Sequence, residues 1–263
     1  MATIKENLNQ WSSYAWKEEG DEWSGPWGGS ASMWYGTLYP RIQAVAKGHR
    51  FLEIAPGYGR CTQFLLKLCD RLTVVDLTQK CIDACKQKFA EYSHLDYHVN
   101  NGKTLEFLED NSIDFVFSWD SLVHANDEVL ASYLRELSKK LKPGGFGFIH
   151  HSNLGDYCDP NTGMLTVESQ HWRDGTMSAE LFRDYCARAG LKCVAQEIIE
   201  WETGVLSDSM SLFTKPIAGV ESDDETRICE NREFMVEVEN LRRIHELYSP
   251  LSTQPCAMTS EAA

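Results

Sequence analysis

Several features that would indicate a membrane, secreted or nucleic-acid-binding protein are scarce or missing in this sequence of 263 residues. No run approaches the roughly 18 apolar residues of a membrane-spanning helix, and residues 1–14 are too polar for the apolar centre of a secretion signal. Its 25 basic side chains are outnumbered by 39 acidic ones and form no cluster, so the chain would repel nucleic acid. We therefore expect a soluble, cytoplasmic protein that binds neither membranes nor nucleic acids.

The nine cysteines lack the spacing of a disulfide framework or a zinc ribbon. Their number is odd, and the sequence contains no CxxC pair. Cys81, Cys85 and Phe89 recur at helical spacing, where cysteine behaves as a small hydrophobe. We expect most of the thiols to be reduced.

The composition is that of an ordinary globular protein, with 43% hydrophobic and 24% charged residues. Between residues 51 and 215, short β-rich runs alternate with helical patterns, which indicates an α/β fold. Strands are expected at residues 51–54, 72–76, 95–99, 113–118, 146–151, 193–201 and 210–214, and helices at residues 60–69, 79–89, 103–108, 127–141 and 179–189. The prediction is a Rossmann-like, doubly wound, mostly parallel seven-stranded sheet with an antiparallel strand at the end.

Two flanks differ from this central region, residues 49–216. Residues 1–48 hold five of the eight tryptophans, interleaved with glycines, and are expected to wrap the domain or to form a lid over a ligand. Residues 217–263 contain an acidic linker at 221–225, a helix near 232–248 and a loose tail. The helix carries an apolar stripe that would dock on the domain or on a second copy, which leaves a homo-oligomer open.

A turn of small residues follows the first expected strand and leads into a helix. Gly57 and Gly59 let the backbone bend sharply and approach a ligand closely, and the following helix offers unpaired N–H groups. Asp76 ends the second expected strand, seventeen residues after Gly59, where a carboxylate can accept both hydroxyls of a ribose. Together these features predict an adenosine site at the carboxyl edge of the sheet.

Two other classes of protein share part of this pattern. A dinucleotide fingerprint requires a third glycine where Thr62 stands, although the spacing to Asp76 is compatible with NAD. The sequence has no convincing Tyr-x-x-x-Lys pair for hydride transfer, which disfavours an NAD-linked reductase. A catalytically silent adenosyl-binding or scaffold protein also stays open.

Five motifs follow one another along the central region. They are the glycine turn, Val75-Asp76-Leu77, Asn101-Gly102, the strand at residues 113–118, and Leu141-Lys142-Pro143-Gly144-Gly145. Over about residues 50–215 this ordered set resembles the class I S-adenosylmethionine-dependent methyltransferases. The resemblance implies S-adenosylmethionine as cofactor.

The resemblance also implies which residues hold this cofactor. In that family the small-residue turn faces the methionine portion, the acid after the second strand holds the ribose, and residues after the third and fourth strands flank the adenine. Carried over by position, the cofactor-binding residues are Glu53, Ala55, Gly57, Gly59, Asp76, Leu77, Asn101, Gly102, Ser118 and Trp119. Two positions depart from the family pattern: Ala55 replaces a frequent glycine and Asn101 a frequent acid.

Two clusters after the fourth and fifth strands contain candidates for a general base. If residues 120–124 are helical, Asp120 and His124 share one face, as a base and its orienting partner would. Along the fifth strand His150 and His151 alternate, so one of the two faces the cleft. We predict His124 or His151 as the base, supported by Asp120. These three residues could instead hold a divalent metal, but without a second nearby carboxylate no metal is predicted.

The acceptor pocket is expected to form from the flanking segments. Residues 152–177 make a long loop at the ligand edge of the sheet, and long loops there are commonly functional. The predicted acceptor-binding residues are Trp23, Trp27, Trp34, His150, Asn153 and Trp172. The sequence thus predicts a methyltransferase of a small polar acceptor, acting on a hydroxyl of a natural product or sugar-like molecule; N-methylation of a small amine is the alternative.

Overall fold

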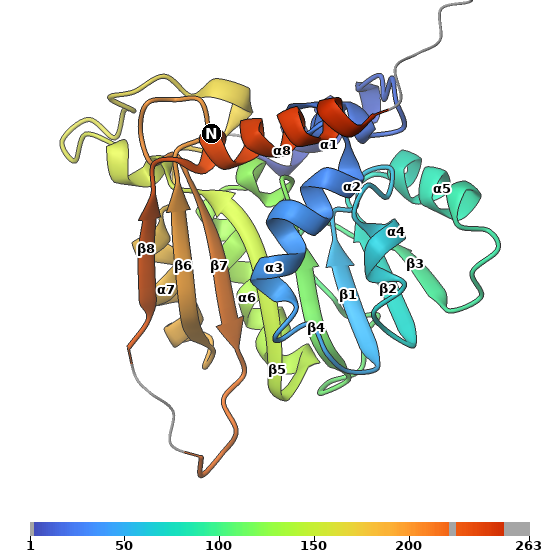
Figure 1. Ribbon diagram of the computed structural model, residues 1–263. Coiled ribbons are helices and arrows are strands. Elements are labelled where there is room, and N and C mark those ends of the chain that lie inside the picture. Colours follow the sequence, from blue (N-terminus) through green and yellow to red (C-terminus); the bar gives the residue numbers. More distant parts are fainter. Residues whose placement is uncertain (1–2, 221–224, 250–263) are drawn as a thin grey trace, which may run out of the picture.

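The computed structural model describes residues 3–220 and 225–249, and these form an α/β structure built on one sheet (Figure 1). Most of the predicted acidic linker and the predicted tail lie outside the described residues. Within the described ranges, no helix has the length and apolar character to cross a membrane.

The eight strands of the sheet are arranged in the order β3-β2-β1-β4-β5-β7-β6-β8. Their bounds are β1 Arg50–Ile54, β2 Arg71–Asp76, β3 Leu95–Val99, β4 Ile113–Ser118, β5 Leu141–Ser152, β6 Lys192–Ile199, β7 Asp208–Thr214 and β8 Arg227–Asn231. β7 is antiparallel to β5 and β6, and the other neighbouring pairs are parallel. The predicted fold class is confirmed, with two corrections: β8 adds an eighth strand, and the antiparallel strand lies inside the sheet.

The missed strand β8 lies at the edge of the sheet, where it pairs with β6 only. Four of its five residues are exposed, so it lacks the apolar alternation by which a half-buried strand is found in a sequence.

Helices cover both faces of the sheet. Their bounds are α1 Ile4–Ser13, α2 Ser30–Met33, α3 Tyr39–Ile42, α4 Thr62–Leu65, α5 Gln79–Lys88, α6 Asp127–Lys140, α7 Ala179–Arg188 and α8 Phe234–Tyr248. α3 and α4 lie in front of the sheet in Figure 1, α6 and α7 lie behind it, and α8 runs along its upper edge.

Two predicted helices are wrong in extent or existence. The helix expected at residues 103–108 is a series of turns, because the Thr104 carbonyl, which a helix would pair with the Leu108 N–H, accepts the Asn100 amide at 2.9 Å instead. The Leu108 N–H donates to the Leu105 carbonyl. The helix expected at residues 60–69 is reduced to α4, and the backbone continues beyond it in tight turns.

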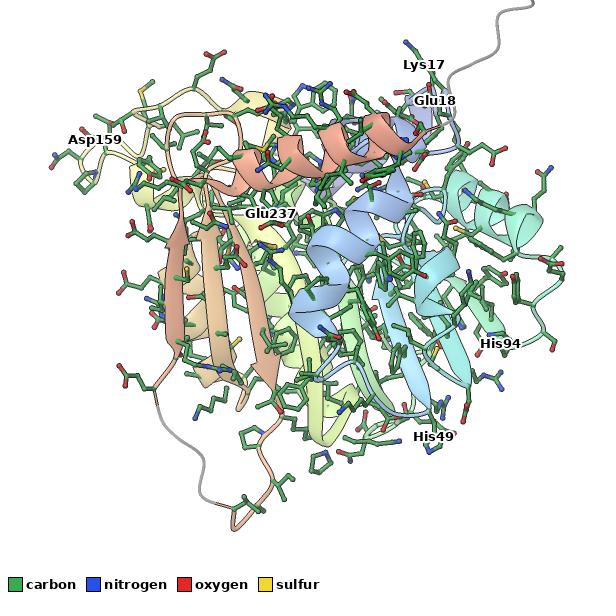
Figure 2. The ribbon with its side chains drawn as sticks, in the orientation of Figure 1. Lys17, Glu18, His49, His94, Asp159 and Glu237 are labelled. Carbon is green, nitrogen blue, oxygen red and sulfur yellow. The ribbon has the colours of Figure 1, made fainter. Side chains whose placement is uncertain are left out.

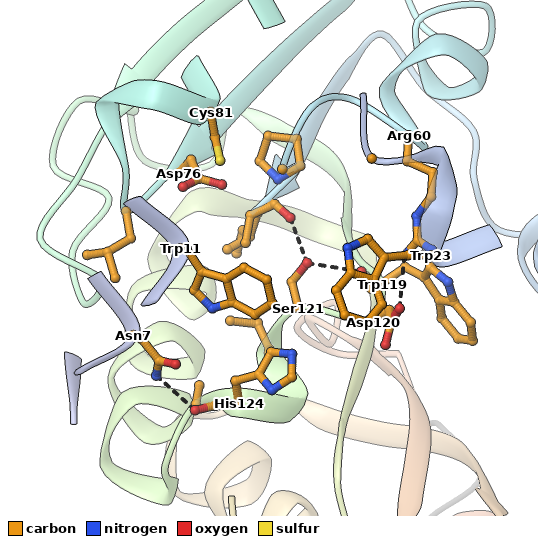
Figure 3. Close-up of a pocket in the computed structure, with 18 of the residues that line it drawn as sticks. Asn7, Trp11, Trp23, Arg60, Asp76, Cys81, Trp119, Asp120, Ser121 and His124 are labelled. Atoms are coloured by element: carbon orange, nitrogen blue, oxygen red, sulfur yellow. Dashed lines mark hydrogen bonds and ion pairs between the residues drawn. The ribbon is translucent and has the colours of Figure 1, made fainter. Parts of the chain in front are cut away.

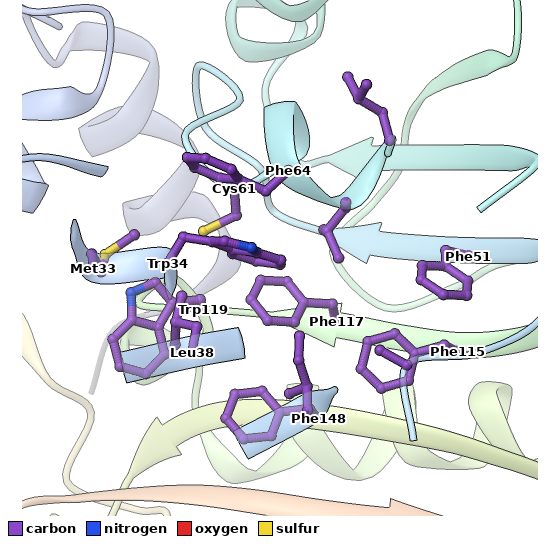
Figure 4. Close-up of a cluster of buried hydrophobic side chains, with 14 of the residues drawn as sticks. Met33, Trp34, Leu38, Phe51, Cys61, Phe64, Phe115, Phe117, Trp119 and Phe148 are labelled. Atoms are coloured by element: carbon purple, nitrogen blue, oxygen red, sulfur yellow. The ribbon is translucent and has the colours of Figure 1, made fainter. Parts of the chain in front are cut away.

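The N-terminal tryptophans contribute to the core on the front face of the sheet. Trp27 and Trp34 are fully buried, and Trp34 stacks on Phe64 with ring centroids 5.1 Å apart (Figure 4). The expectation that these two side chains bind the acceptor is therefore wrong, since burial among core aromatics leaves them no free surface. This part of the N-terminal segment is a structural wrap.

A polar network joins the two flanks of the chain to the sheet. The Arg41 guanidinium on α3 donates to Glu197 of β6 and to Glu237 of α8, at distances of 2.7–2.9 Å (Figure 2 labels Glu237 beneath α8). Both flanks therefore pack on the central region, while the predicted division into three segments stays a prediction.

Candidate functional site

A pocket of about 300 Å³ opens at the carboxyl edge of the parallel strands. It is lined by α1 and the tryptophan-rich segment after it, the glycine turn after β1, the ends of β2 and β4, and the loops that precede α7 and follow β6. Figure 3 shows side chains from these segments pointing into one space. The motifs that the sequence singled out thus meet at one site.

The glycine turn presents main chain to this pocket. Ala55 and Gly57 both have φ of 57° and both line the pocket, whereas Gly59, with φ of 80°, does not. A side chain at Gly59 would meet the Phe89 ring, so this glycine permits close packing of the turn on α5. A Cβ atom at Gly57 would lie 2.8 Å from Cη2 of Trp16, which stacks on Tyr58.

Asp76 ends β2 as predicted, and its buried carboxylate lines the pocket. Burial raises the pKa of this carboxyl to about 6, although hydrogen bonds from the Thr78 N–H and hydroxyl oppose the shift. Leu77 and Gly102 lie beside it. This end of the pocket suits a ribose and the base attached to it.

Glu53 lies in β1 at the back of the pocket and is almost completely buried. Burial raises the pKa of this carboxyl to about 8, and the Thr62 hydroxyl donates to it at 2.5 Å. Thr62, which stands where a dinucleotide fingerprint has its third glycine, thus anchors this carboxyl.

Besides Gly59, two of the predicted cofactor residues lie outside the pocket lining. Asn101 is exposed and accepts bonds from its own loop, and Ser118 donates to the Ile54 carbonyl, which ties β4 to β1. Trp119, the next residue, lines the pocket and stacks on His150 with ring centroids 4.4 Å apart.

His124 faces the pocket from the short 3-10 turn Leu122–His124. Its Nδ1 lies 3.0 Å from the Trp172 carbonyl, which can only accept, so Nδ1 carries the proton and Nε2 has a free lone pair. Burial lowers the pKa of this imidazole, which keeps it neutral. A neutral imidazole with a fixed tautomer is equipped to accept a proton at Nε2.

The expected pairing of Asp120 with His124 on one helical face is wrong. Asp120 adopts a positive φ of 53° and precedes a turn too short to form such a face. Its carboxylate instead pairs with the Arg60 guanidinium, Nη2 to Oδ2, at 3.0 Å. Both side chains line the pocket, and the carbonyl of Trp172 orients His124 in place of Asp120.

The histidines of β5 do not line the pocket, contrary to the expectation for one of them. His151 is fully buried and stacks on Phe182 of α7 with centroids 4.4 Å apart, which places it on the rear face. His150 is also fully buried, with its Nε2 3.2 Å from Asp208. His150 therefore supports Trp119 from behind, and a base role for His151 lacks access to the pocket.

The remaining predicted acceptor residues divide between the pocket and its surroundings. Trp23 lines the pocket, together with Trp11, which packs on His124 with ring centroids 5.1 Å apart. Trp172 contributes its carbonyl to His124, while the residue as a whole is 57% exposed. Asn153 is buried beneath the loop, where its amide binds the Leu206 carbonyl and the Ala179 N–H, so it serves the fold.

Sequence reasoning missed several residues that line the pocket. Arg60 lines the pocket, and its place directly after the glycine turn could have indicated this in the sequence. Arg173, Trp201 and Glu202 lie in loops without a motif, so only the folded chain brings them to the site.

Asp120, His124 and His151 do not converge on a metal. Across residues 3–220 and 225–249, no group of three or more histidine, cysteine, aspartate or glutamate side chains is placed to hold an ion.

The central region matches a known family. Residues 51–145 match the family model described as a methyltransferase domain. Together with the ordered motifs, this match supports the class I S-adenosylmethionine-dependent methyltransferase family for the central region. S-adenosylmethionine is accordingly the cofactor of this methyltransferase, as the resemblance of the motifs implied.

The chain is similar to plant methyltransferases, and the similarity covers only part of their length. Phosphoethanolamine N-methyltransferase 1 of Triticum aestivum is 28% identical over 150 residues, which are 55% of this chain and 30% of that relative. The enzyme of the same name from Zea mays is 26% identical over 141 residues, 52% of this chain and 27% of that relative. The matched region thus spans less than a third of these relatives.

Solved methyltransferase structures share the fold. A SAM-dependent methyltransferase of Leishmania major superposes with a TM-score of 0.59 at 15% identity, covering 80% of this chain and 82% of that chain. The CcbJ methyltransferase of Streptomyces caelestis superposes with a TM-score of 0.55 at 15% identity, covering 77% and 100%. At this identity the likeness concerns the fold.

Proposed function

We propose that this methyltransferase transfers a methyl group from S-adenosylmethionine to a hydroxyl oxygen of a small polar acceptor, such as a natural product or sugar-like molecule. The observation that carries the proposal is His124: a neutral, buried imidazole with one fixed tautomer, at a pocket that also holds Asp76 and Gly57.

The residues of the pocket fit the cofactor. Asp76 would accept the ribose hydroxyls, and the main chain at Gly57 would lie against the methionine portion. Arg60 follows that turn, and its buried Nη1 has no partner, which suits an amino-acid carboxylate. S-adenosylmethionine supplies an electrophilic methyl group on a sulfonium centre.

The chain's own contribution is to position the acceptor, exclude water and remove a proton. A hydroxyl nucleophile loses its proton as its oxygen attacks, and His124 Nε2 would accept that proton. The aromatic rings of Trp11 and Trp23 close the pocket beside it, which limits the access of water. Binding energy from these contacts serves the alignment of the oxygen with the methyl group.

N-methylation of a small amine is the second candidate. It is favoured by the similarity to the plant phosphoethanolamine N-methyltransferases. An amine also needs a proton acceptor once it is methylated, so His124 is compatible with either atom.

A transfer assay separates the two candidates. Incorporation of a labelled methyl group would be measured on matched acceptors that carry either hydroxyls or an amine on the same skeleton, such as a sugar and its amino-sugar. The proposal expects methylated oxygen; methylation confined to nitrogen would replace it with the second candidate. Failure of S-adenosylhomocysteine to stabilise the protein in a thermal-shift assay, or stabilisation by NADH instead, would reject both.

A further inference from the structure

We propose that Arg173 and Trp119 form an anion-binding subsite for the acceptor, so that the methylated molecule carries a carboxylate or phosphate group. This inference rests on the proposed function, because it assigns a chemical class to the acceptor in the same pocket. The subsite uses Nη2 of Arg173 and Nε1 of Trp119, and neither role follows from a sequence motif.

Unpaired buried donors gather around this pocket. Among the described residues, seven buried side-chain nitrogen or oxygen atoms have no hydrogen-bond partner, and five of them belong to residues that line the pocket: Trp16 Nε1, Trp23 Nε1, Arg60 Nη1, Trp119 Nε1 and Arg173 Nη2. All five are N–H groups. A buried donor without a partner costs stability that a bound acceptor recovers, so this set points to a ligand rich in oxygen.

Arg173 is held rigidly while one of its nitrogens stays free. Its side chain is 1% exposed, and its Nε donates to both carboxylate oxygens of Asp208 at 2.6 and 2.7 Å. Its guanidinium lies over the Trp201 ring, 5.0 Å from the centroid. These contacts fix the plane of the guanidinium before a ligand binds, and they leave Nη2 without a hydrogen-bond partner.

Trp119 belongs to the same cluster. Its ring lies against His150 and Trp201, with centroids 4.4 and 5.8 Å apart, and its Nε1 has no partner. Because Arg173 packs on that same Trp201 and also lines the pocket, both free donors belong to one wall of it.

The position of this wall in the sheet assigns it to the acceptor. Asp76 ends β2 and the glycine turn follows β1, so the cofactor would occupy that side of the carboxyl edge. Trp201 follows β6, and the partner of Arg173, Asp208, begins β7, both on the opposite side of β4. Figure 3 likewise separates Asp76 from Trp119 across the pocket.

The carboxylates near Arg173 do not fill its free position. Asp208 binds Nε, Asp120 pairs with Arg60, and Glu202 lies 3.4 Å from His171. Each acid thus has a cationic or potentially cationic partner of its own. A carboxylate or phosphate oxygen offers acceptors only and matches a charged N–H donor more strongly than a hydroxyl, which brings a further donor to satisfy.

The test measures binding of small anions to the full chain saturated with S-adenosylhomocysteine. Ligand-observed NMR titrations would compare acetate with its neutral analogue acetamide, and inorganic phosphate would distinguish a phosphate site from a carboxylate site. We expect acetate or phosphate to bind at least about 10-fold more tightly than acetamide, a ratio typical of hydrogen bonds to charged groups. If neither acetate nor phosphate binds more tightly than acetamide, the proposal is overturned.

Two variants assign the binding to these donors. Arg173→Lys keeps a charge beside Asp208 but removes Nη2, and Trp119→Phe keeps a ring between its neighbours but removes the N–H group; each should weaken anion binding about 10-fold. Arg188→Lys, at a side chain 70% exposed, is the matched control and should change nothing. If Arg173→Lys fails to fold, as judged by circular dichroism, Trp119→Phe still decides the question, because unaltered anion binding in it contradicts the subsite.

The outcomes separate this inference from the proposed function. If S-adenosylhomocysteine does not bind, the proposed function fails, and the same anion titration on the free protein still tests the subsite. If S-adenosylhomocysteine binds but the anions do not, only the subsite is rejected.

Discussion

At the scale of single residues, the chemistry proposed for His124 depends on one carbonyl group. The Trp172 carbonyl fixes the proton of the imidazole on Nδ1, and burial keeps the ring neutral. The sequence singled out His124 from its place after the fourth strand. Its partner could not be predicted, because Trp172 is 48 residues away in a loop without periodicity.

The base role of His124 predicts a particular loss of activity. His124→Ala should lower kcat about 100-fold or more, as loss of a general base typically does, with little change in affinity for S-adenosylhomocysteine. The pH profile adds a second readout. Because the pKa of His124 lies below 6.5, the wild-type rate should persist as the pH falls through 6.5 and decline only at lower pH. A parallel loss of turnover and of S-adenosylhomocysteine binding would show instead that His124 supports the fold.

At the scale of elements, the secondary-structure prediction failed where local side-chain hydrogen bonds or a positive φ interrupt a helix. Helical periodicity predicted a helix at residues 103–108, but the Asn100 carboxamide occupies the Thr104 carbonyl that a helix would pair with the Leu108 N–H. A similar limit applies to residues 120–124, where the positive φ of Asp120 prevents a continuous helix. The strands that carry the site were predictable because their apolar runs are buried on both faces.

The glycine turn offers a direct test at this scale. Gly57→Ala should lower the free energy of unfolding by about 1–2 kcal/mol, because φ of 57° is strained for any residue with a Cβ atom. It should also weaken binding of S-adenosylhomocysteine, since the added methyl group would displace Trp16. Gly163→Ala is the matched control, with φ of 67° and no atom within 4 Å of the added Cβ. Its unfolding should resemble that of the first variant while S-adenosylhomocysteine binding is unchanged; equal binding by both variants would remove the turn from the site.

At the scale of the whole molecule, one half of the pocket lining could be predicted from the sequence and the other half could not. The half at β1, β2 and β4 follows from ordered motifs and from the rule that parallel strands present their carboxyl ends at one edge. The other half comes from the N-terminal wrap and from the loops before α7 and after β6, which meet only in the folded chain. For this reason the sequence could not predict that Trp27 and Trp34 are buried or that Arg173 lines the pocket.

The network at Arg41 predicts how strongly the flanks stabilise the molecule. Arg41→Met removes a guanidinium that binds two carboxylates on β6 and α8, and it should lower the free energy of unfolding by roughly 2 kcal/mol, a value discounted for partial exposure of the three side chains. Arg71→Met breaks an exposed pair with Asp96 and should cost less than about 0.5 kcal/mol. Chemical denaturation measures both. Equal stability of the two variants would mean that the flanks are held by apolar packing alone.

The central claim is that Asp76 and the turn at Gly57 hold the cofactor, and calorimetric titration with S-adenosylhomocysteine tests it most directly. The wild-type chain should bind at pH 7.5, and affinity should fall as the pH drops through about 6, where the Asp76 carboxyl gains its proton. Asp76→Ala should weaken binding by roughly 10-fold or more, the usual consequence of losing hydrogen bonds to a charged group. An Asp76→Ala protein that binds S-adenosylhomocysteine as tightly as the wild type would contradict the account.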